Sequence, residues 1–555
     1  MKRTLFPILS LLLCAVLLLS ACAFAKIDPE PTEKDPLVPE ETPGQSSGDD
    51  ETAVFAPLTA DVRAELDAIY LQKLAATQAF AAVPAAKGTT WYVSSLNGND
   101  KNAGTSPAAA WKTTANCASN VQEGDTVLFE CGSVFRRSGN DNFAVMKNGV
   151  TYAAYGEGAK PLFYGSVNAS GANNWKQVGG KENLYCFKTL VDPSYDIGTI
   201  VFNGGEAWGI KVQMTYLGRK DSNPGRSHQT LPLTDVSNGL QTGLSVAEYD
   251  LYSGNDLQGP DLCFYHDSNG KVYLYSEGGN PGTRFSSIEL SLPGFAFAGN
   301  SGVSDVTILN LDFRNFAGHV VHTFDCKNLT VKNCSFVFVG GTIMSDYGGW
   351  RNYDTRLGDA IENWDSCDGM VVENCFFDQV YDTPMTTQST SAVASKNIAY
   401  RNNVVLHTWF GAELWTVNTG VAFCNVEISG NYFGKLGEGF TTTRPDKKDP
   451  GEDFMINGFI EVGSKHHAMS DFSVTDNVVD GTVATMLFCL QPQTKNDPNG
   501  VLFDRNTYIG TTSVDFARLY ERGNASTGYP YTAEGVAAVR ELGMEPNGKF
   551  YYVVE

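Results

Sequence analysis

Four carboxylates in the middle of the chain have the types and spacing that acid–base chemistry needs: Asp359, Glu362, Asp382 and Glu413. Glu362-Asn-Trp364 and Glu413-Leu-Trp415 share the pattern Glu-x-Trp, and each follows a glycine and a small residue. Aligning the two patterns places Glu362 over the position of Glu413, and Asp359 over Asp382. Like charges brought this close cannot all ionise easily, so one pKa is expected to rise, as general acid catalysis at neutral pH requires.

Aromatic and amide side chains near these carboxylates are candidates for sugar-binding subsites, because a flat ring offers a face on which a pyranose can stack. The candidate substrate-binding residues nearest the carboxylates are Trp364, Gln388, Trp409 and Trp415. Four more lie in two long segments, 340–357 and 442–458, and are Arg351, Tyr353, Arg356 and Arg444. Long loops on a regular scaffold tend to be functional, and these are expected to overhang the carboxylates.

Two other interpretations of the carboxylates are open. They can be exposed acids on a solvated face, since the chain has a formal net charge of −22. They can also hold Ca²⁺, which takes six to eight oxygen ligands. No other metal or cofactor is expected. His319 and His322 are three apart on a strand-like run, so they are predicted to point to opposite faces and not to form a metal pair.

The element that must position these residues is a short phrase repeated through the second half of the chain. It reads apolar-x-x-Asn/Cys-x-apolar, as in Val372-Glu-Asn-Cys375-Phe-Phe377. Its fourth positions, separated by 23 to 46 residues, are Leu311, Cys334, Cys375, Asn403, Asn431, Asn477 and Asn506. Such self-similarity indicates a solenoid, and apolar alternation at period two makes its units strands. We therefore predict an all-β parallel β-helix with coils stacked at ~4.8 Å.

Cysteine spacing repeats with the coils. Cys326 and Cys367 each lie eight residues before Cys334 and Cys375, so the two pairs occupy the same places on consecutive coils. This favours stacked free thiols inside the solenoid. Disulfides between adjacent coils are the alternative, because the strand spacing falls within the Cα–Cα range that a disulfide needs.

The N-terminal residues predict export and a lipid anchor. A charged start, an apolar run from Leu5 to Leu19 and the small-residue site before Cys22 resemble a bacterial lipoprotein signal peptide over 1–22, with the lipid on Cys22. The acidic, Pro-rich segment 23–55 is expected to be a disordered linker, followed by a helical segment over 56–88. The protein is thus expected to be exported, anchored to a bacterial membrane, and facing the cell surface or periplasm.

The rest of the chain, 89–555, is expected to form the β-helix domain. The rhythm breaks at about 171–290, where short strand-like runs joined by Gly/Asn turns predict a β-rich insertion. A helix at about 532–542 would cover the last coil, as terminal repeats require.

Two groups of motifs resemble known β-helix proteins. Trp91-Tyr-Val-Ser94, Asn97-Gly-Asn-Asp100 and Glu123-Gly-Asp-Thr-Val-Leu-Phe129 resemble the start of pectate-lyase-like right-handed parallel β-helix proteins. The resemblance implies that fold over most of 89–510, an N-terminal capping helix and a carbohydrate-active context. Gly358-Asp-Ala-Ile-Glu-Asn-Trp364, with Ala412-Glu-Leu-Trp415, looks like the central coils of bacterial β-helix glycoside hydrolases. The polygalacturonase pattern of paired Asp with Gly-His-Gly is absent from this sequence.

Three functions are compatible with these features. The first is a surface-tethered glycoside hydrolase of a neutral or mildly charged polysaccharide, in which Asp359 and Asp382 are the catalytic pair and Glu362 and Glu413 are partners or substitutes. The second is a polysaccharide lyase acting on uronates, in which the loop arginines would neutralise the charge of the uronate carboxylate. The third is a non-catalytic glycan-binding or adhesive lipoprotein. The acidic charge argues against nucleic acid as a partner, and a monomer is expected.

Overall fold

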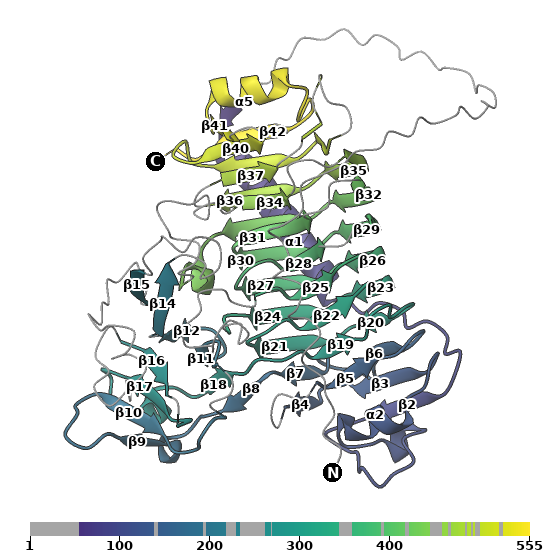
Figure 1. Ribbon diagram of the computed structural model, residues 1–555, viewed down its shortest axis with the longest axis vertical. Coiled ribbons are helices and arrows are strands. Elements are labelled where there is room, and N and C mark those ends of the chain that lie inside the picture. Colours follow the sequence, from purple (N-terminus) through teal and green to yellow (C-terminus); the bar gives the residue numbers. More distant parts are fainter. Residues whose placement is uncertain are drawn as a thin grey trace, which may run out of the picture. The chain divides into compact units, whose positions relative to one another are not determined.

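The computed structural model describes residues 55–554, apart from 138–141, 193–195, 212, 218–228, 234–260, 268, 343–357, 390–392, 417–420, 444–457, 464–467, 483–484, 490–491, 494, 496–499 and 521–525. These residues belong to one compact unit, Val54–Glu555. Three stacked parallel sheets form a right-handed β-helix, which confirms the predicted fold class. The coils rise from the teal to the yellow end of the chain in Figure 1.

Each regular coil passes through sheets B, A and C in that order. Sheet B contains β2 (Thr90–Val93), β3 (Thr126–Glu130), β6 (Thr151–Tyr155), β20 (Thr307–Leu309), β23 (Lys327–Lys332), β26 (Asp368–Glu373), β29 (Ser395–Arg401), β32 (Val421–Ser429), β35 (Ala468–Thr475) and β38 (Leu502–Asp504). Sheet A contains β4 (Val134–Arg136), β7 (Leu162–Tyr164), β21 (Asp312–Phe316), β24 (Ser335–Val339), β27 (Phe376–Val380), β30 (Val404–Thr408), β33 (Tyr432–Leu436), β36 (Val478–Thr482), β39 (Thr507–Gly510), β42 (Lys549–Tyr552) and β1 (Phe55–Pro57).

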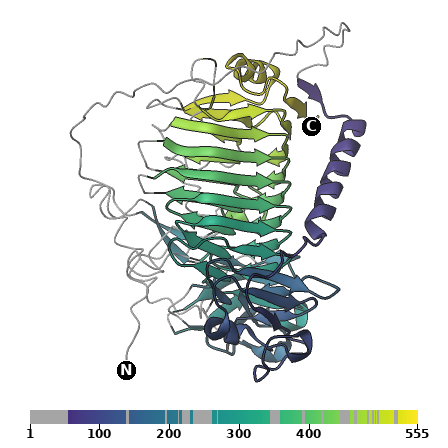
Figure 2. The same cartoon turned by 90° about the vertical axis from the view of Figure 1, so that its right-hand side faces the viewer.

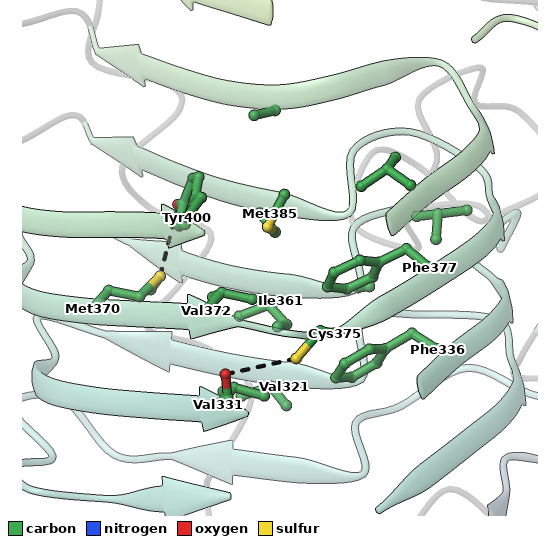
Figure 3. Packing of buried hydrophobic residues seen from close by; sticks show 14 of the residues in the cluster. Val321, Val331, Phe336, Ile361, Met370, Val372, Cys375, Phe377, Met385 and Tyr400 are labelled. Atoms are coloured by element: carbon green, nitrogen blue, oxygen red, sulfur yellow. Dashed lines mark hydrogen bonds between the residues drawn. The ribbon is translucent and has the colours of Figure 1, made fainter. Parts of the chain in front are cut away.

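Sheet C carries the candidate site. Its strands are β5 (Ala144–Met146), β19 (Phe297–Gly299), β22 (Val321–Phe324), β25 (Ile361–Trp364), β28 (Met385–Ser389), β31 (Phe410–Thr416) and β34 (Gly458–Gly463). A separate small sheet contains β37 (Thr485–Cys489), β40 (Asp515–Tyr520) and β41 (Ser526–Pro530). Every second residue of a strand points its side chain into the interior. Figure 3 shows Val321, Ile361 and Met385 of sheet C facing Phe336 and Phe377.

The repeated phrase marks the corner between sheets B and A. Its third position has a positive φ in every coil, and the residues there are Asn310, Asn333, Asn374, Asn402, Gly430, Asp476 and Arg505. Asn, Gly and Asp tolerate this left-handed conformation best, which explains why the phrase is rich in them. Its fourth position points inward, where both the N–H and the amide nitrogen of Asn403 donate to Oδ1 of Asn431 at 2.9 and 3.0 Å.

This asparagine ladder continues along the stack through Asn477 and Asn506, which again pair at 2.9 Å. It ends on a buried carboxylate, because Asn506 and the hydroxyl of Tyr508 donate to Glu545 at 2.6 and 2.7 Å. The predicted equivalence of these four asparagines is therefore confirmed. Each amide is fully hydrogen-bonded in the interior, so the ladder fixes how successive coils stack.

The predicted thiol stack is also observed. Every cysteine in the described part of the chain is free, and Cys326, Cys334, Cys367 and Cys375 are buried. The sulfur atoms of Cys326 and Cys367 lie 3.5 Å apart on adjacent coils.

The β-rich insertion beside the first coils consists of strands that pair antiparallel, except for β13 with β16, which are parallel. One group contains β8 (Ser166–Asn168), β11 (Ile200–Phe202), β12 (Ala207–Trp208) and β18 (Ile288–Ser291). The other contains β9 (Trp175–Gln177), β10 (Leu184–Phe187), β13 (Ile210–Lys211), β16 (Cys263–His266) and β17 (Val272–Tyr275), next to the hairpin of β14 (Gln213–Leu217) and β15 (Gln229–Leu233). The buried residues of the insertion form their own core.

Helices flank the solenoid. Helix α1 (Ala60–Gln78) begins after Thr59, whose hydroxyl accepts from the N–H of Val62, and it runs beside sheet A in Figure 2. Its residue Leu66 packs on Val404 and Tyr432. The remaining described helices are α2 (Cys117–Asn120), α4 (Pro281–Arg284) and α5 (Ala533–Glu541), with 3₁₀ turns η1 (Pro107–Ala109), η2 (Thr114–Asn116), η3 (Ala172–Asn174) and η5 (Gly439–Thr443). None of the described helices has the length and apolar character required to span a bilayer.

Candidate functional site

A row of polar side chains crosses sheet C where the sequence predicted the carboxylates. The strand register pairs His322 with Glu362, Glu362 with Thr386, and Thr386 with Glu413. Because the neighbouring residues Val321, Ile361 and Met385 fill the interior, this row lies on the other face of the sheet. Glu362 and Glu413 are therefore two strands apart, and they occupy equivalent positions, as the Glu-x-Trp alignment predicted.

Asp359 and Asp382 lie just before β25 and β28, on adjacent coils. The N–H of Thr383 donates to Oδ1 of Asp359 at 3.1 Å, and the N–H of Asp382 donates to the carbonyl of Gly358 at 3.1 Å. The two aspartates are thus neighbours on adjacent coils. The pairing of β25 with β28 begins only at Ile361 and Met385, so no strand register covers Asp359 and Asp382, and their exact register stays a prediction.

Glycine at position 358 allows the two coils to approach here. A Cβ atom built on Gly358 would lie 2.7 Å from Cβ of Asp382, which is closer than non-bonded carbons can be. The aspartates therefore come together because one coil lacks a side chain at the point of contact.

Two histidines complete the cluster, and here the sequence prediction was wrong. Nε2 of His319 lies 3.0 Å from Oε2 of Glu362, and Nδ1 of His322 lies 2.6 Å from the same oxygen. Both histidines thus face one carboxylate and do not point to opposite faces. His319 precedes β22, which begins at Val321, so the alternation of side chains along a strand does not reach it.

A sequence signal for these histidines does exist. Because Val321 pairs with Ile361, Gly318-His319-x-x-His322 lies over Gly358-Asp359-x-x-Glu362. The backbone N–H of Asp359 lies 3.3 Å from Nδ1 of His319, as this alignment requires. Comparing Gly-containing segments one coil apart would have placed the histidines beside the carboxylates.

Burial and neighbouring charges set the protonation of the cluster. Burial, together with the carboxylates of Asp382, Glu362 and Glu413, holds the pKa of Asp359 well above its ordinary value, against the opposing effect of His319. Burial lowers the pKa of His319, but the Glu362 and Asp359 carboxylates outweigh it and raise that pKa to about 9. Burial acts to raise the pKa of Glu362, but the two histidines outweigh it and keep that pKa below its ordinary value.

The consequence is an unequal pair of acids on one coil. The pKa of Asp359 is raised, while that of Glu362, three residues later and beside two imidazoles, is lowered. Carboxyl groups whose environments separate their pKa values in this way are suited to opposite acid–base roles.

Glu413 and the tryptophans flank the buried cluster. Oε2 of Glu413 accepts hydrogen bonds from the hydroxyl of Thr386 and the amide of Gln388, each at 2.9 Å. The rings of Trp364 and Trp415 are stacked, with centroids 6.5 Å apart and planes at 29°, on either side of the strand that carries Gln388. Both tryptophans are partly exposed, whereas Trp409 is buried with 5% exposure and offers little open face to a sugar.

Several predicted site residues fall outside the described residues. These are Arg351, Tyr353 and Arg356 of the first long segment, Arg444 of the second, and Cys22 at the N-terminus.

His319, His322 and Glu362 are also the described residues best placed to hold a metal ion, since one ligand atom from each lies within 4.8 Å of the others. The two imidazole planes are nearly parallel, at 13° with centroids 5.3 Å apart. Nδ1 of His322 and Oε2 of Glu362 have no hydrogen-bond partner of suitable geometry among the described residues, so their contact is an ion pair by distance alone. Ca²⁺ prefers oxygen ligands, and two of these three donors are nitrogens.

Comparison with known proteins adds similarity over part of the chain. No family model matches the sequence. The lacto-N-biosidase of Bifidobacterium longum subsp. longum is 32% identical over 218 residues, which is 35% of this chain and 13% of that protein. Among solved structures, a glycoside hydrolase has a TM-score of 0.43 at 11% identity, over 78% of this chain and 94% of that one. XylC in complex with xylose has a TM-score of 0.40 at 11% identity, over 80% and 74% of the two chains.

Proposed function

We propose that this protein is a glycoside hydrolase whose proton donor is Asp359. The observation that carries the proposal is the buried Asp359 carboxyl, whose pKa is raised by burial and by three further carboxylates. It lies three residues before Glu362, whose pKa is lowered by the two histidines beside it. A protonated acid beside an ionised one is what cleavage of a glycosidic bond requires. The partial similarity to a protein named lacto-N-biosidase supports the same reaction class.

The second catalytic carboxylate in this proposal is Asp382, with Glu413 as its substitute. Both are less buried than Asp359 and Glu362, and both contribute to the raised pKa of Asp359. Glu362 has a different role, because its Oε2 is already shared by two imidazoles. We assign it, with His319, to positioning and charge control and not to direct attack.

Trp364, Gln388 and Trp415 form the sugar-binding surface beside the acids. Stacked, partly exposed indoles provide apolar faces for a pyranose, and Gln388 provides an amide between them. The surrounding carboxylates repel anions, so a neutral glycan is the preferred substrate class and a uronate-containing one is disfavoured.

The experiment is a screen of the purified protein against a panel of neutral and uronate-containing glycans, including a lacto-N-bioside, with mass analysis of the products. Hydrolysis adds one water to each cleaved bond, and Asp359→Asn should abolish it. An unsaturated uronate product would instead support the lyase. Tight binding of a glycan without any product, in wild type and variant alike, would support a non-catalytic adhesin.

We also propose that the enzyme is exported and anchored through a lipid on Cys22. The support is the charged start, the apolar run and the small-residue site before Cys22. Labelled fatty acid should enter the wild-type protein and not the Cys22→Ser variant. Absence of label from wild type, with the protein found free in the medium, would contradict the anchor.

A further inference from the structure

Two of the buried thiols face each other directly behind the candidate site. Cys326 lies between β22 and β23, and Cys367 lies between β25 and β26, on the coils that carry the histidines and Glu362. The register of Lys327 with Asp368 stacks the two cysteines. Their sulfur atoms are 3.5 Å apart, and each residue is 1% exposed.

The second stacked pair has a different arrangement. The thiol of Cys334 points to the carbonyl of Lys332 at 3.3 Å, and that of Cys375 points to the carbonyl of Glu373 at 3.5 Å. Each of these thiols therefore contacts the backbone of its own strand. Of the two pairs, only Cys326 and Cys367 have each other as the sulfur's hydrogen-bonding partner.

The backbone on both sides of the Cys326–Cys367 contact is already held in place. The N–H of Cys326 donates to Oδ1 of Asn363 at 3.1 Å, and the N–H of Cys367 donates to the hydroxyl of Ser395 at 3.2 Å. Adjacent parallel strands lie ~4.8 Å apart, which is within the Cα–Cα range of a disulfide. The spacing of the coils therefore permits a bond between the two sulfurs.

We propose that Cys326 and Cys367 form a disulfide when the chain folds in an oxidising medium, whereas Cys334 and Cys375 stay reduced. The oxidant is a small-molecule disulfide such as oxidised glutathione. One cysteine thiolate attacks it and releases one glutathione thiol, and the second cysteine then displaces the other. Two protein thiols lose their protons and two electrons, and one glutathione disulfide becomes two thiols.

The timing of this reaction follows from burial. In the folded protein both sulfurs are shielded from any oxidant, and the hydrogen bond with Cys326, together with burial, holds the pKa of the Cys367 thiol well above its usual range. A thiol that is neither exposed nor ionised reacts slowly. The bond therefore forms while the two coils are stacking and before they are shielded from solvent, and a protein folded in reducing conditions keeps both thiols.

The cross-link has a consequence for the site. It joins residues 41 apart in sequence, and the enclosed segment contains Asp359 and Glu362. It also ties that coil to the one bearing His319 and His322. The disulfide would fix the separation across which the histidines hold Glu362, independently of which reaction the site performs.

The test compares the full chain made by export into the bacterial periplasm with the same chain made in a reducing cytoplasm. Both are unfolded in the presence of an alkylating agent, digested and mapped by mass spectrometry. The expected result is one linked pair of peptides, Cys326 with Cys367, in the exported protein only, with Cys334 and Cys375 alkylated in both. The exported form should also unfold at a higher temperature.

Variants provide the matched controls. Cys326→Ser should lose the linked peptides and the thermal difference, while Cys334→Ser should keep both; if Cys326→Ser does not fold, Cys367→Ala serves in its place. Full alkylation of Cys326 and Cys367 in the exported protein would overturn the proposal, as would a Cys334–Cys375 link. Rapid formation of the bond when oxidised glutathione is added to the folded, reduced protein would overturn the proposed timing.

Discussion

Oε2 of Glu362 lies within ion-pair distance of two imidazoles at once, with Nε2 of His319 at 3.0 Å and Nδ1 of His322 at 2.6 Å. This contact helps to give different pKa values to the carboxyl groups of Asp359 and Glu362, which are only three residues apart in the sequence. Glu362 is kept ionised by the positive charge beside it, and its own negative charge then favours the protonated form of Asp359. The histidines lower the pKa of Glu362, while burial and the neighbouring carboxylates raise that of Asp359 against the effect of His319.

Replacing the proposed acid should abolish most of the activity. We expect Asp359→Asn to lower kcat by ~10²-fold or more, because a positioned acid typically contributes 10²–10⁴. Wild-type activity should fall as pH rises through the raised pKa of Asp359. The control is Asp305→Asn, which changes an exposed aspartate and should leave kcat unchanged. Full activity of Asp359→Asn would eliminate it as the donor.

Removing the histidine charge should change stability and its pH dependence together. His319 has a folded pKa of about 9, above its ordinary 6.5, so it stabilises the protein below about pH 6.5 and loses that effect as pH rises through 9. His319→Gln should lower the free energy of unfolding by ~3 kcal/mol at pH 6, because the buried Glu362 carboxylate loses one of its two histidine partners. The urea midpoint of this variant should change less between pH 6 and pH 9 than the midpoint of the wild-type protein does.

The partly exposed ion pair of His407 with Asp378 is the matched control for that experiment. His407→Gln should cost ~1 kcal/mol or less, as exposed ion pairs do. Equal effects of the two substitutions would show that burial does not strengthen the His319–Glu362 pair.

Glu545, at the end of the asparagine ladder, should make the free energy of unfolding fall as pH rises from about 4.5 to about 7. Burial raises its pKa to about 7 from 4.5. An acid with a raised folded pKa stabilises the fold below its unfolded value and loses that effect as pH rises to the folded value. Glu545→Gln should therefore gain stability relative to wild type between pH 5 and pH 8, by at most about 3 kcal/mol.

Urea unfolding of wild type and Glu545→Gln at the two pH values measures this difference. Glu541→Gln, at an exposed position of α5, should follow wild type at both. A Glu545→Gln protein that loses as much stability as wild type on going to pH 8 would show that another group titrates.

The asparagine ladder should contribute as much to the free energy of unfolding as several ordinary hydrogen bonds do. In the interior, the amide of Asn477 donates to Asn506 and to the carbonyl of Ile428, and it accepts from Asn431. Asn477→Ala should reduce the free energy of unfolding by ~3 kcal/mol, because it strands buried donors and acceptors. Asn120→Ala, at an exposed helix end, should cost less than ~0.5 kcal/mol. Chemical denaturation of both variants checks the difference.

Sugar binding should depend on the exposed tryptophan face. Trp415→Ala should raise KM about tenfold with little change in kcat, which corresponds to ~1.4 kcal/mol of binding free energy lost equally from ground and transition states. Trp415→Phe keeps a flat ring and should recover most of the affinity. An unchanged KM in Trp415→Ala would place the sugar elsewhere on sheet C.

The sequence could predict the features that depend on regular repetition. The corner phrase identified the coils because its third residue must adopt a left-handed conformation and its fourth must fit the interior, so both positions restrict residue type. Glu362 and Glu413 could be aligned for the same reason, since each belongs to a strand with a fixed alternation.

Features outside the regular strands could not be predicted in this way. His319 lies in a bend before β22, and Asp382 lies before β28, so their directions depend on local backbone that strand alternation does not describe. The three residues of β1 belong to a segment whose composition predicted a linker and a helix, yet they pair with β42 from the far end of the chain. Such a short strand has too little pattern to be recognised before its partner is known.

The β1–β42 pairing also changes how the solenoid can come apart. A stack of repeats normally frays from its ends, because a terminal coil has only one neighbour. Here β1 pairs with the last coil, and α1 then leads back to the early coils, where the carbonyls of Ala76 and Ala79 accept from Asn333. Opening of either end must therefore also detach the segment formed by β1 and α1. The two ends of the stack should then open as one cooperative unit in hydrogen exchange.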